Sequence, residues 1–378
     1  MARAYLDHAS SSPLRPVALD AMLPFLREHH ADPGRLHAEG RVTRVALEEA
    51  RASVAACFGA RPREVVFTAS GTEAVNTAIW GGVKRSGKHS PHVVTTAVEH
   101  SSVRDALARS RAEVTTVPVD TDGRYSEADV LAALRDDTAL VSVQLANHEV
   151  GTVQPAGAVA AEARARGVLV HVDACAAAGH VPVDFHALDA DLCSVTAHKL
   201  GGPKGAGALL VRRGLRLDPL LVGGAQERAR RAGIEDVPAW VGFGAACAAL
   251  DVDREAASQR ALIAIAARVI DAVPGVTRFG PGPTDPGATL PNLLCFGVHG
   301  VEAEPILLAL DQHGVAVHSG SSCSSETLEP SPVLAAMGVD ADHSLRVSVG
   351  WSSEPADVER FVEVFPGIVE RMRGLRAP

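Results

Sequence analysis

The sequence predicts an α/β protein in which a large domain with a mostly parallel sheet is followed by a smaller α+β domain. Short runs of β-branched residues alternate with amphipathic helical patterns over roughly the first half of the chain, which is typical of parallel strands joined by crossover helices. This rhythm changes after about Val252, where a long helical pattern leads into a segment rich in proline and glycine. With 378 residues, of which 47% are hydrophobic, the chain is long enough for both domains.

The elements of the large domain are expected in a regular order. Apolar residues at helical spacing predict a helix over 41–59, which Gly59 ends. Short apolar runs predict buried strands, and ligands bind at the carboxyl ends of such strands. The strands are expected at 64–68, 92–96, 113–119, 139–145, 168–173, 191–197 and 207–213, and the helical segments among them at 69–83, 102–110, 127–135 and 156–167.

The second domain is expected to begin with a helix over 254–273. The proline- and glycine-rich segment follows, and strands are then expected over 293–298, 313–319 and 345–350, with helices between and after them. We assign residues 16–252 to the large domain, and residues 1–15 together with 253–378 to the small one.

Composition argues against several classes of protein. The chain has 36 Lys and Arg against 45 Asp and Glu, and this net charge of −9 disfavours direct binding to nucleic acid. None of the six cysteines is paired as CxxC, which argues against a zinc site, and no metal is expected. The sequence has neither an apolar signal core nor a run of about 18 apolar residues, so no membrane association and a reducing, cytoplasmic location are expected.

Two stretches place reactive groups directly after predicted strands. Lys199 precedes a glycine-rich turn, where partial burial would free its amine as a nucleophile, and Thr196 and His198 flank it as hydrogen-bond donors. Asp173 ends a strongly apolar strand, and a carboxylate there suits the pyridinium nitrogen of pyridoxal phosphate. The ordinary alternatives are a lysine in a surface turn and an aspartate that caps a helix.

Three further positions complete a candidate site. In the strand-to-helix turn 68–76, Gly71 permits close approach of the backbone, and Thr72 with the helix N-terminus suits a phosphate, although helix capping alone would explain the turn. His100 follows a strand and could stack on a planar cofactor and transfer protons, or merely begin a helix. Arg346, at the head of a short strand, could bind a carboxylate or form a structural salt bridge. Together these groups indicate a site for an amino acid and a phosphorylated planar aldehyde.

One cysteine lies in an unusual setting. Cys323 stands among glycine and serines in the stretch SGSSCSSETLEP, whereas buried structural cysteines usually lie among apolar side chains. It is therefore either incidental to a surface loop or a nucleophile on a mobile segment.

Stretches from nearly the whole chain, taken in order, resemble the cysteine desulfurases of the class V aminotransferase group, which are pyridoxal-phosphate enzymes of fold type I. The serine-rich loop around the cysteine and the sequence after it resemble the group I branch, the iron–sulfur-cluster type. The stretches that carry the resemblance are YLDHASSSPLRP, DPGRLHAEGR, SGTEAVN, VEHSSV, NHEVGTVQP, VDACAAAG, AHKLGGPKGAG, RAGIEDVP, SGSSCSSETLEPSPVLAAMG and LRVSVGWSSE.

The resemblance implies a role for each matching residue. Lys199 would bind pyridoxal 5'-phosphate covalently and move protons, and His100 would stack on the ring and assist. Cys323 would take the sulfur of L-cysteine as a persulfide while L-alanine is released, and Arg346 would bind the substrate carboxylate. The residues implied in cofactor binding are Gly71, Thr72, His148, Asp173, Thr196, His198 and Lys199. The resemblance also implies a homodimer and sulfur-acceptor proteins, for example in iron–sulfur cluster assembly or tRNA thiolation.

Three positions depart from the family pattern. His148 stands where the family has an asparagine and Ala176 where it has a glutamine, both of which contact the ring oxygen of the cofactor. Ile234 replaces a threonine that reaches the phosphate of the partner subunit. Two other functions stay open. One is a selenocysteine or C–S lyase of the same fold, which need not depend on a loop thiol; the other, suggested by these departures, is a weakly active scaffold that binds partners.

Overall fold

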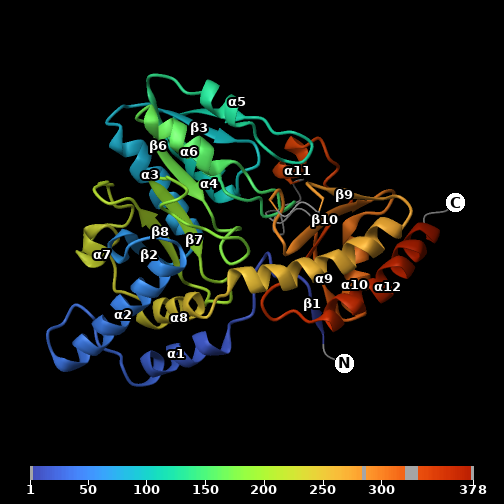
Figure 1. Ribbon diagram of the computed structural model, residues 1–378, viewed down its shortest axis with the longest axis horizontal. Coiled ribbons are helices and arrows are strands. Elements are labelled where there is room, and N and C mark those ends of the chain that lie inside the picture. Colours follow the sequence, from blue (N-terminus) through green and yellow to red (C-terminus); the bar gives the residue numbers. More distant parts are fainter. Residues whose placement is uncertain (1–2, 283–286, 320–330, 376–378) are drawn as a thin grey trace.

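The computed structural model describes residues 3–282, 287–319 and 331–375, and its two main sheets lie side by side (Figure 1). The larger sheet has the strand order β2-β8-β7-β6-β5-β3-β4. All neighbouring pairs from β7 to β4 are parallel, whereas β8 is antiparallel to both β2 and β7. The strands are β2 (Val65–Thr68), β3 (His92–Thr96), β4 (Glu113–Val117), β5 (Thr138–Gln144), β6 (Leu169–Asp173), β7 (Leu192–Thr196) and β8 (Gly207–Val211). The predicted α/β class with a mostly parallel sheet is confirmed.

Helices cover both faces of this sheet because its strands are apolar on both sides. Helices α3 and α4 pack on one face, and α2, α6 and α8 pack on the other. The helices of this part are α1 (Pro16–Arg27), α2 (Ala38–Cys57), the 3-10 turn η1 (Pro62–Glu64), α3 (Gly71–Arg85), α4 (Ser101–Arg109), α5 (Glu127–Ala132), α6 (Ala156–Ala165), α7 (Gln226–Ala229) and α8 (Val237–Ala248).

The smaller sheet is antiparallel and has the order β12-β13-β10-β9, beside a short parallel pair of β1 with β11. Helix α9 (Val252–Ala272) runs from the larger part to the smaller one (Figure 1). The other elements are β1 (Ala4–Tyr5), β9 (Val276–Phe279), β10 (Leu293–Val298), α10 (Ala303–Gln312), β11 (Val315–Ala316), β12 (His318–Ser319), α11 (Pro332–Ala336), β13 (Ser344–Ser348) and α12 (Pro355–Gly374). Pairing of β1 with β11 brings the N-terminal segment to the C-terminal third of the chain.

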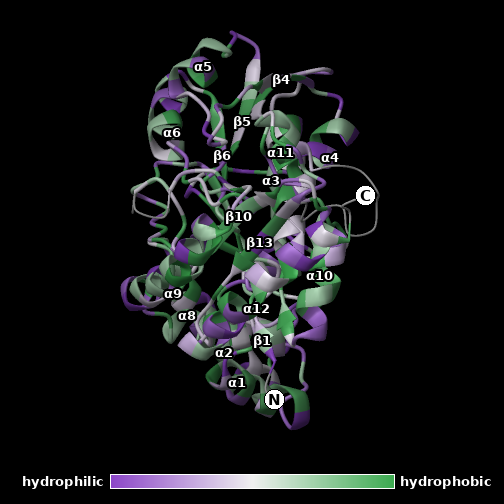
Figure 2. Cartoon of the chain, turned by 90° about the vertical axis from the view of Figure 1, so that its right-hand side faces the viewer, coloured by the Kyte–Doolittle hydropathy of each residue, from purple (hydrophilic) through white to green (hydrophobic). Residues whose placement is uncertain are grey.

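Each sheet has its own apolar core. The larger cluster joins the central strands to α2, α6 and α8, and a second cluster joins the smaller sheet to α9, α10 and α12. Ala4 and Leu6 belong to this second cluster, so the N-terminal residues pack with the later part of the chain. Figure 2 shows hydrophobic colouring along central strands such as β10 and β13, with hydrophilic segments toward the periphery. No helix among the described residues combines the length and the apolar character required to cross a membrane.

One expected element differs in the structure. The single strand predicted over 313–319 forms two short strands, β11 and β12, which belong to different sheets. Val317 lies between them and packs against the second core, so a break in the pairing carries the chain from one sheet to the other. Alternating apolar residues predict extended backbone, but they do not specify which strand will be the partner.

Candidate active site

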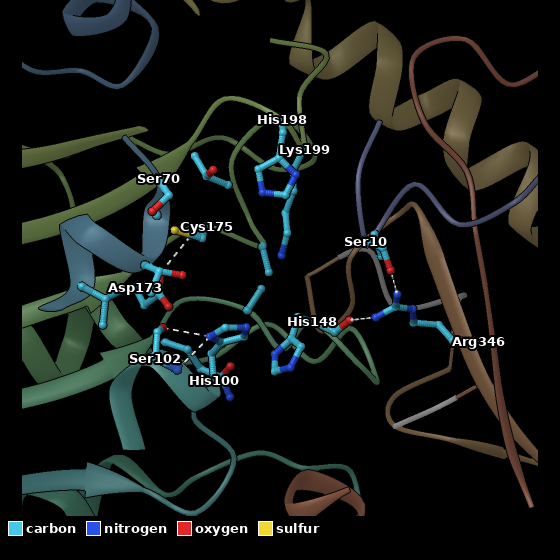
Figure 3. A pocket seen from close by; sticks show the side chains of 18 residues that line it. Ser10, Ser70, His100, Ser102, His148, Asp173, Cys175, His198, Lys199 and Arg346 are labelled. Atoms are coloured by element: carbon cyan, nitrogen blue, oxygen red, sulfur yellow. Dashed lines mark hydrogen bonds between the residues drawn. The ribbon is translucent and has the colours of Figure 1, made fainter. Parts of the chain in front are cut away.

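A cavity of about 240 Å³ lies at the carboxyl edge of the larger sheet and reaches the smaller one (Figure 3). Since the strand ends of a parallel sheet meet at one edge, side chains distant in sequence converge there. The structure brings together nine of the ten predicted site residues in the lining: Gly71, Thr72, His100, His148, Asp173, Thr196, His198, Lys199 and Arg346. The tenth, Cys323, lies outside the described residues.

The N-terminus of α3 forms one end of the cavity. Ser70 caps the helix, because its hydroxyl oxygen accepts a hydrogen bond of 3.1 Å from the Glu73 amide. This leaves the first helical amides, at Gly71 and Thr72, without a partner inside the helix, and the positive end of the helix dipole favours an anion there. A side chain at Gly71 is excluded, since a Cβ atom would lie 2.6 Å from the Cys175 sulfur. The turn therefore caps a helix and also provides a cradle for a phosphate.

Strand β7 and the turn after it supply two more polar groups to this end. The Thr196 hydroxyl is buried and has no hydrogen-bond partner among the described residues. Burial and the nearby Lys199 and Lys204 charges lower the pKa of His198 to about 4, so its ring is neutral near pH 7. An orphaned hydroxyl and a neutral imidazole are both suited to donating hydrogen bonds to an anion.

Lys199 extends into the cavity from the loop between β7 and β8 (Figure 3). This loop stays at the carboxyl edge because β8 returns antiparallel to β7. The N-terminal segment holds the loop: the Ser12 amide donates to the His198 carbonyl at 2.9 Å, and the Ser12 hydroxyl donates to the Lys199 carbonyl at 3.0 Å. The backbone of the lysine is therefore fixed by residues nearly 190 positions away.

Asp173 ends β6 and is buried in the cavity wall. Its Oδ1 atom accepts a hydrogen bond of 3.0 Å from the Cys175 amide and one of 2.8 Å from the Ser194 hydroxyl. Burial alone would raise the pKa of this carboxyl, but the neighbouring His171 and the Cys175 hydrogen bonds outweigh it, and the pKa lies below the usual aspartate value. Asp173 is therefore an anion at the carboxyl end of a central strand.

His100 caps α4 and lines the cavity as well. The Ser102 amide donates to its Nδ1 atom at 3.1 Å. Because an amide can only donate, Nδ1 is the acceptor, and the neutral ring carries its proton on Nε2. Both interpretations of this histidine from sequence, as a residue at a helix start and as a cavity residue, describe the same side chain.

His148 lies beside His100 in an edge-to-face ring contact, with ring centroids 5.0 Å apart and planes at 68° (Figure 3). Ala176, the second departure from the family pattern, also lines the cavity, and it offers no polar side-chain atom there. The third departure, Ile234, has 69% of its surface exposed in the single chain.

Arg346 reaches the cavity from the smaller sheet, but it occupies the centre of β13 rather than the head of a strand. Its guanidinium donates to the His148 carbonyl at 2.8 Å, to Asp7 at 3.0 Å and to the Ser10 hydroxyl at 2.8 Å. The Nε atom is buried and has no hydrogen-bond partner among the described residues. Arg346 therefore forms a structural ion pair and at the same time places a cation beside the cavity.

Two buried glutamates beside the site were not identified from the sequence. Burial raises the pKa of Glu99 to about 8, although the Thr96 hydroxyl and the Gln144 amide both donate to it. Burial also acts on Glu149, but His148, the Ser331 hydroxyl and Arg346 outweigh it, and the pKa lies below the usual value. The sequence offered one clue to them, because each glutamate is the direct neighbour of a histidine predicted to belong to the site.

Cys175 is the other cysteine near the site, since its thiol lines the cavity beside Gly71. Burial and the Asp173 charge raise the pKa of this thiol well above its usual value. A protonated thiol is a weak nucleophile, so Cys175 is poorly suited to attack a substrate.

The geometry fits pyridoxal phosphate on three separate grounds. The helix N-terminus and the orphaned Thr196 hydroxyl match a phosphate. The anionic Asp173 matches a pyridinium nitrogen, and the amine of Lys199 matches an aldehyde carbon. These groups lie in one cavity, as the cofactor would require.

Comparison with known proteins agrees with this geometry. The aminotransferase class-V family model matches residues 4–361. Cysteine desulfurase IscS of Methanosarcina thermophila is 38% identical over 98% of this chain and 93% of its own length. Among solved structures, a NifS-like protein superposes with a TM-score of 0.89 at 29% identity, over 98% of this chain and all of its own. A structure described as SspA in complex with cysteine gives 0.80 at 28% identity, over 92% and 98% of the two chains.

Folds of this class depend in general on pyridoxal phosphate, and the predicted fold type I is confirmed. The IscS relative also confirms the predicted group I branch. The chain therefore belongs to the class-V aminotransferase family and, within it, to the cysteine desulfurases.

Proposed function

We propose that this chain holds pyridoxal 5'-phosphate on Lys199 and converts L-cysteine to L-alanine while Cys323 takes the sulfur. The reaction balances as L-cysteine plus the Cys323 thiol giving L-alanine plus a Cys323 persulfide. The observation that carries the proposal is the convergence of Lys199, Asp173 and His100 in one cavity at the N-terminus of α3. The cysteine bound to the structural neighbour SspA supports cysteine as the substrate.

Bound pyridoxal phosphate supplies an electron sink that stabilises negative charge on the substrate while its carbon–sulfur bond breaks. Around it, the amides of Gly71 and Thr72 with the Thr196 and His198 side chains hold the phosphate. Asp173 accepts a hydrogen bond from the ring nitrogen and keeps that nitrogen protonated. His148 lines the cavity where the family asparagine contacts the ring oxygen, and its ring can donate in the same way.

The remaining residues act on the substrate. The Lys199 amine takes a proton from the α-carbon of cysteine, and the Nε2 atom of His100, in the same cavity, would assist in proton transfer. Arg346 attracts the substrate carboxylate. Cys323 attacks the substrate sulfur. The Cys175 thiol is the poorer candidate, since burial and the Asp173 charge raise its pKa.

The persulfide product determines which partner proteins this chain needs. A persulfide on Cys323 is passed on to sulfur-acceptor proteins, such as those of iron–sulfur cluster assembly or tRNA thiolation, in a cytoplasmic setting. The protein acts as a homodimer in which the segment around Ile234 faces the other subunit. The exposure of Ile234 in the single chain supports this arrangement.

The test is mass spectrometry of the purified protein after addition of L-cysteine, together with an assay for alanine. We expect a mass gain of one sulfur on the peptide that contains Cys323, and roughly one alanine per sulfur. Cys323→Ser abolishes both products while the protein keeps its cofactor, and Cys175→Ser, the matched control, keeps most of the activity. Normal alanine and sulfide formation by Cys323→Ser would overturn the mechanism and favour a lyase.

A further inference from the structure

A line of buried polar side chains lies behind Asp173, on the side away from the cavity. His171 precedes Asp173 by two residues on β6, so both side chains lie on one face of the sheet. Ser142 of β5 pairs with His171 across the strands, and Ser194 of β7 pairs with Asp173. Three adjacent strands thus place four polar side chains side by side, on the face of the sheet that also carries Leu140, Leu169 and Leu192.

The distances connect these side chains into one chain of hydrogen bonds. Ser142 Oγ lies 2.9 Å from His171 Nδ1, and His171 Nε2 lies 3.2 Å from Ser194 Oγ. Ser194 Oγ lies 2.8 Å from Asp173 Oδ1 and donates to it. Each link therefore lies within the range of a normal or slightly long hydrogen bond.

The direction of the chain follows from its last link. An ionised carboxylate only accepts, so the single hydroxyl proton of Ser194 points at Asp173. Ser194 must then accept from His171, which places the proton of the neutral ring on Nε2. Nδ1 is consequently an acceptor, and the Ser142 hydroxyl donates to it. Every donor in the line points toward Asp173.

The surroundings favour this arrangement over a charged histidine. The side chains of Ser142, His171 and Ser194 are completely buried. Burial lowers the pKa of His171 to about 4 despite the nearby Asp173, so the ring is neutral near pH 7. A neutral imidazole has one donor and one acceptor, which is what the two flanking hydroxyls require.

We propose that His171 and Ser194 are positioning residues for Asp173, which hold its Oδ1 atom as a fixed acceptor and thereby turn Oδ2 toward the ring nitrogen of the cofactor. The proposal rests on the proposed function only in taking that cofactor to be pyridoxal phosphate. The Cys175 amide is the second donor to Oδ1, at 3.0 Å, so Oδ1 is held from two sides, and neither of these donors uses Oδ2. A carboxylate fixed in this way does not need to reorient when the ring binds.

The ordinary alternative is that His171 only satisfies buried hydroxyls. The chain offers a matched control for that role in His92, a buried histidine on β3. Its two ring nitrogens each lie 2.8 Å from a threonine hydroxyl, on Thr138 and Thr115, and burial lowers its pKa too. His92 does not line the cavity, so it shares the structural role and lacks the connection to Asp173.

The experiment compares His171→Leu, Ser194→Ala and His92→Leu with the unmodified protein. The cofactor-free proteins are titrated with pyridoxal 5'-phosphate, without cysteine, and the dissociation constant and the absorption maximum of the bound cofactor are recorded. We expect His171→Leu and Ser194→Ala to weaken cofactor binding by about tenfold and to shift the absorption maximum. His171→Gln, which keeps a donor toward Ser194, should recover part of the loss. His92→Leu should lower thermal stability while leaving both cofactor readouts unchanged.

The outcomes separate this inference from the proposed function. If the unmodified protein takes up no pyridoxal phosphate, the proposed function fails, and the inference fails with it. If the unmodified protein binds the cofactor and His171→Leu and Ser194→Ala bind it equally well with the same absorption maximum, only the positioning role is overturned. An equal loss of affinity in His92→Leu would also overturn it, since the effect would then be one of stability.

Discussion

The two walls of the cavity are built in different ways. On the larger sheet, Asp173 ends a strand, and Lys199 and Gly71 follow shortly after the carboxyl ends of two others. On the smaller sheet, Arg346 comes from the centre of an antiparallel strand, and Asp7 and Ser10 of the N-terminal segment hold it. The first wall carries the groups suited to the cofactor, and the second carries the cation suited to the substrate carboxylate.

The difference shows what each topology can contribute to a site. In a parallel sheet every crossover returns the chain to the same edge, so functional groups gather there through the fold alone. An antiparallel sheet provides no such edge, and a buried arginine within it requires a carboxylate partner to offset the loss of hydration. The wall of the smaller sheet therefore depends on contacts between the two ends of the chain, whereas the wall of the larger sheet depends on local turns.

The largest effect is expected at the larger wall. Lys199→Ala should lower alanine formation by about 10³-fold or more, because no other amine lines the cavity among the described residues. The control is Lys204→Ala, an exposed lysine five residues later that should leave activity nearly unchanged. Borohydride reduction of the loaded protein, followed by peptide mass analysis, checks the attachment point. A cofactor label on Lys204 would contradict the assignment.

A second comparison concerns the buried glutamates beside the two walls. The folded-state pKa of Glu99 is raised from 4.5 to about 8, so the stability contributed by its neutral form is present below pH 4.5 and is lost as the pH rises to about 8. Glu99→Gln, which stays neutral, should therefore be more stable than the unmodified protein above pH 8, by an upper bound of roughly 5 kcal/mol. Urea unfolding of the cofactor-free protein at several pH values measures this difference.

Glu149 provides the contrast, because its pKa is lowered in the folded state. A lowered pKa contributes stability above the usual carboxyl value, and that stability is lost as the pH falls. Glu149→Gln should therefore destabilise the protein at neutral pH, opposite in sign to Glu99→Gln. The same sign for both variants would show that the environments of the two walls do not differ in this way.

The effect at the smaller wall should be intermediate. Arg346→Gln is expected to lower kcat/KM for cysteine by about 10²-fold, mainly through KM, because a buried cation beside the carboxylate is lost. It should also destabilise the fold, since Asp7 loses its partner. The control is Arg51→Gln, which removes another buried arginine that pairs with Glu227 at 2.6 Å but does not line the cavity. Steady-state kinetics should show a raised KM for cysteine in Arg346→Gln and an unchanged KM in Arg51→Gln.

The larger wall was also the one that the sequence could predict. Lys199, Asp173 and Gly71 stand where strand patterns end, and the parallel topology itself implies that such positions meet. The N-terminal residues Asp7 and Ser10 carried no such signal, since their role arises only when β1 pairs with β11. The predicted position of Arg346 at a strand head was wrong for a related reason. Strand boundaries in the smaller sheet depend on partners distant in sequence.

Buried carboxylates show a further limit of sequence-based reasoning. A glutamate next to a histidine looks like an ordinary solvated pair, but both glutamates are buried. What separates them is their partners, because His148, Ser331 and Arg346 lower the pKa of Glu149 whereas burial dominates at Glu99. The chain of hydrogen bonds behind Asp173 could not be predicted for the same reason, because His171 lies within a strand whose other residues are mostly apolar. This chain of hydrogen bonds exists because the register of the neighbouring strands places Ser142 and Ser194 beside β6. Strand register depends on tertiary pairing and is not specified by the local sequence.

The smallest effect is expected outside both walls, at Ile234. If this exposed residue faces the cofactor phosphate of a partner subunit, Ile234→Thr adds a hydroxyl that can donate to it, and the cofactor dissociation constant should fall by about two- to tenfold. Ile234→Val is the matched control, since valine has the shape of threonine without the hydroxyl. Cofactor titration of both variants, with sedimentation to follow the oligomeric state, measures the effect. Tighter binding by threonine alone would assign the segment to a shared site, whereas equal affinity in the two variants would place it away from any phosphate.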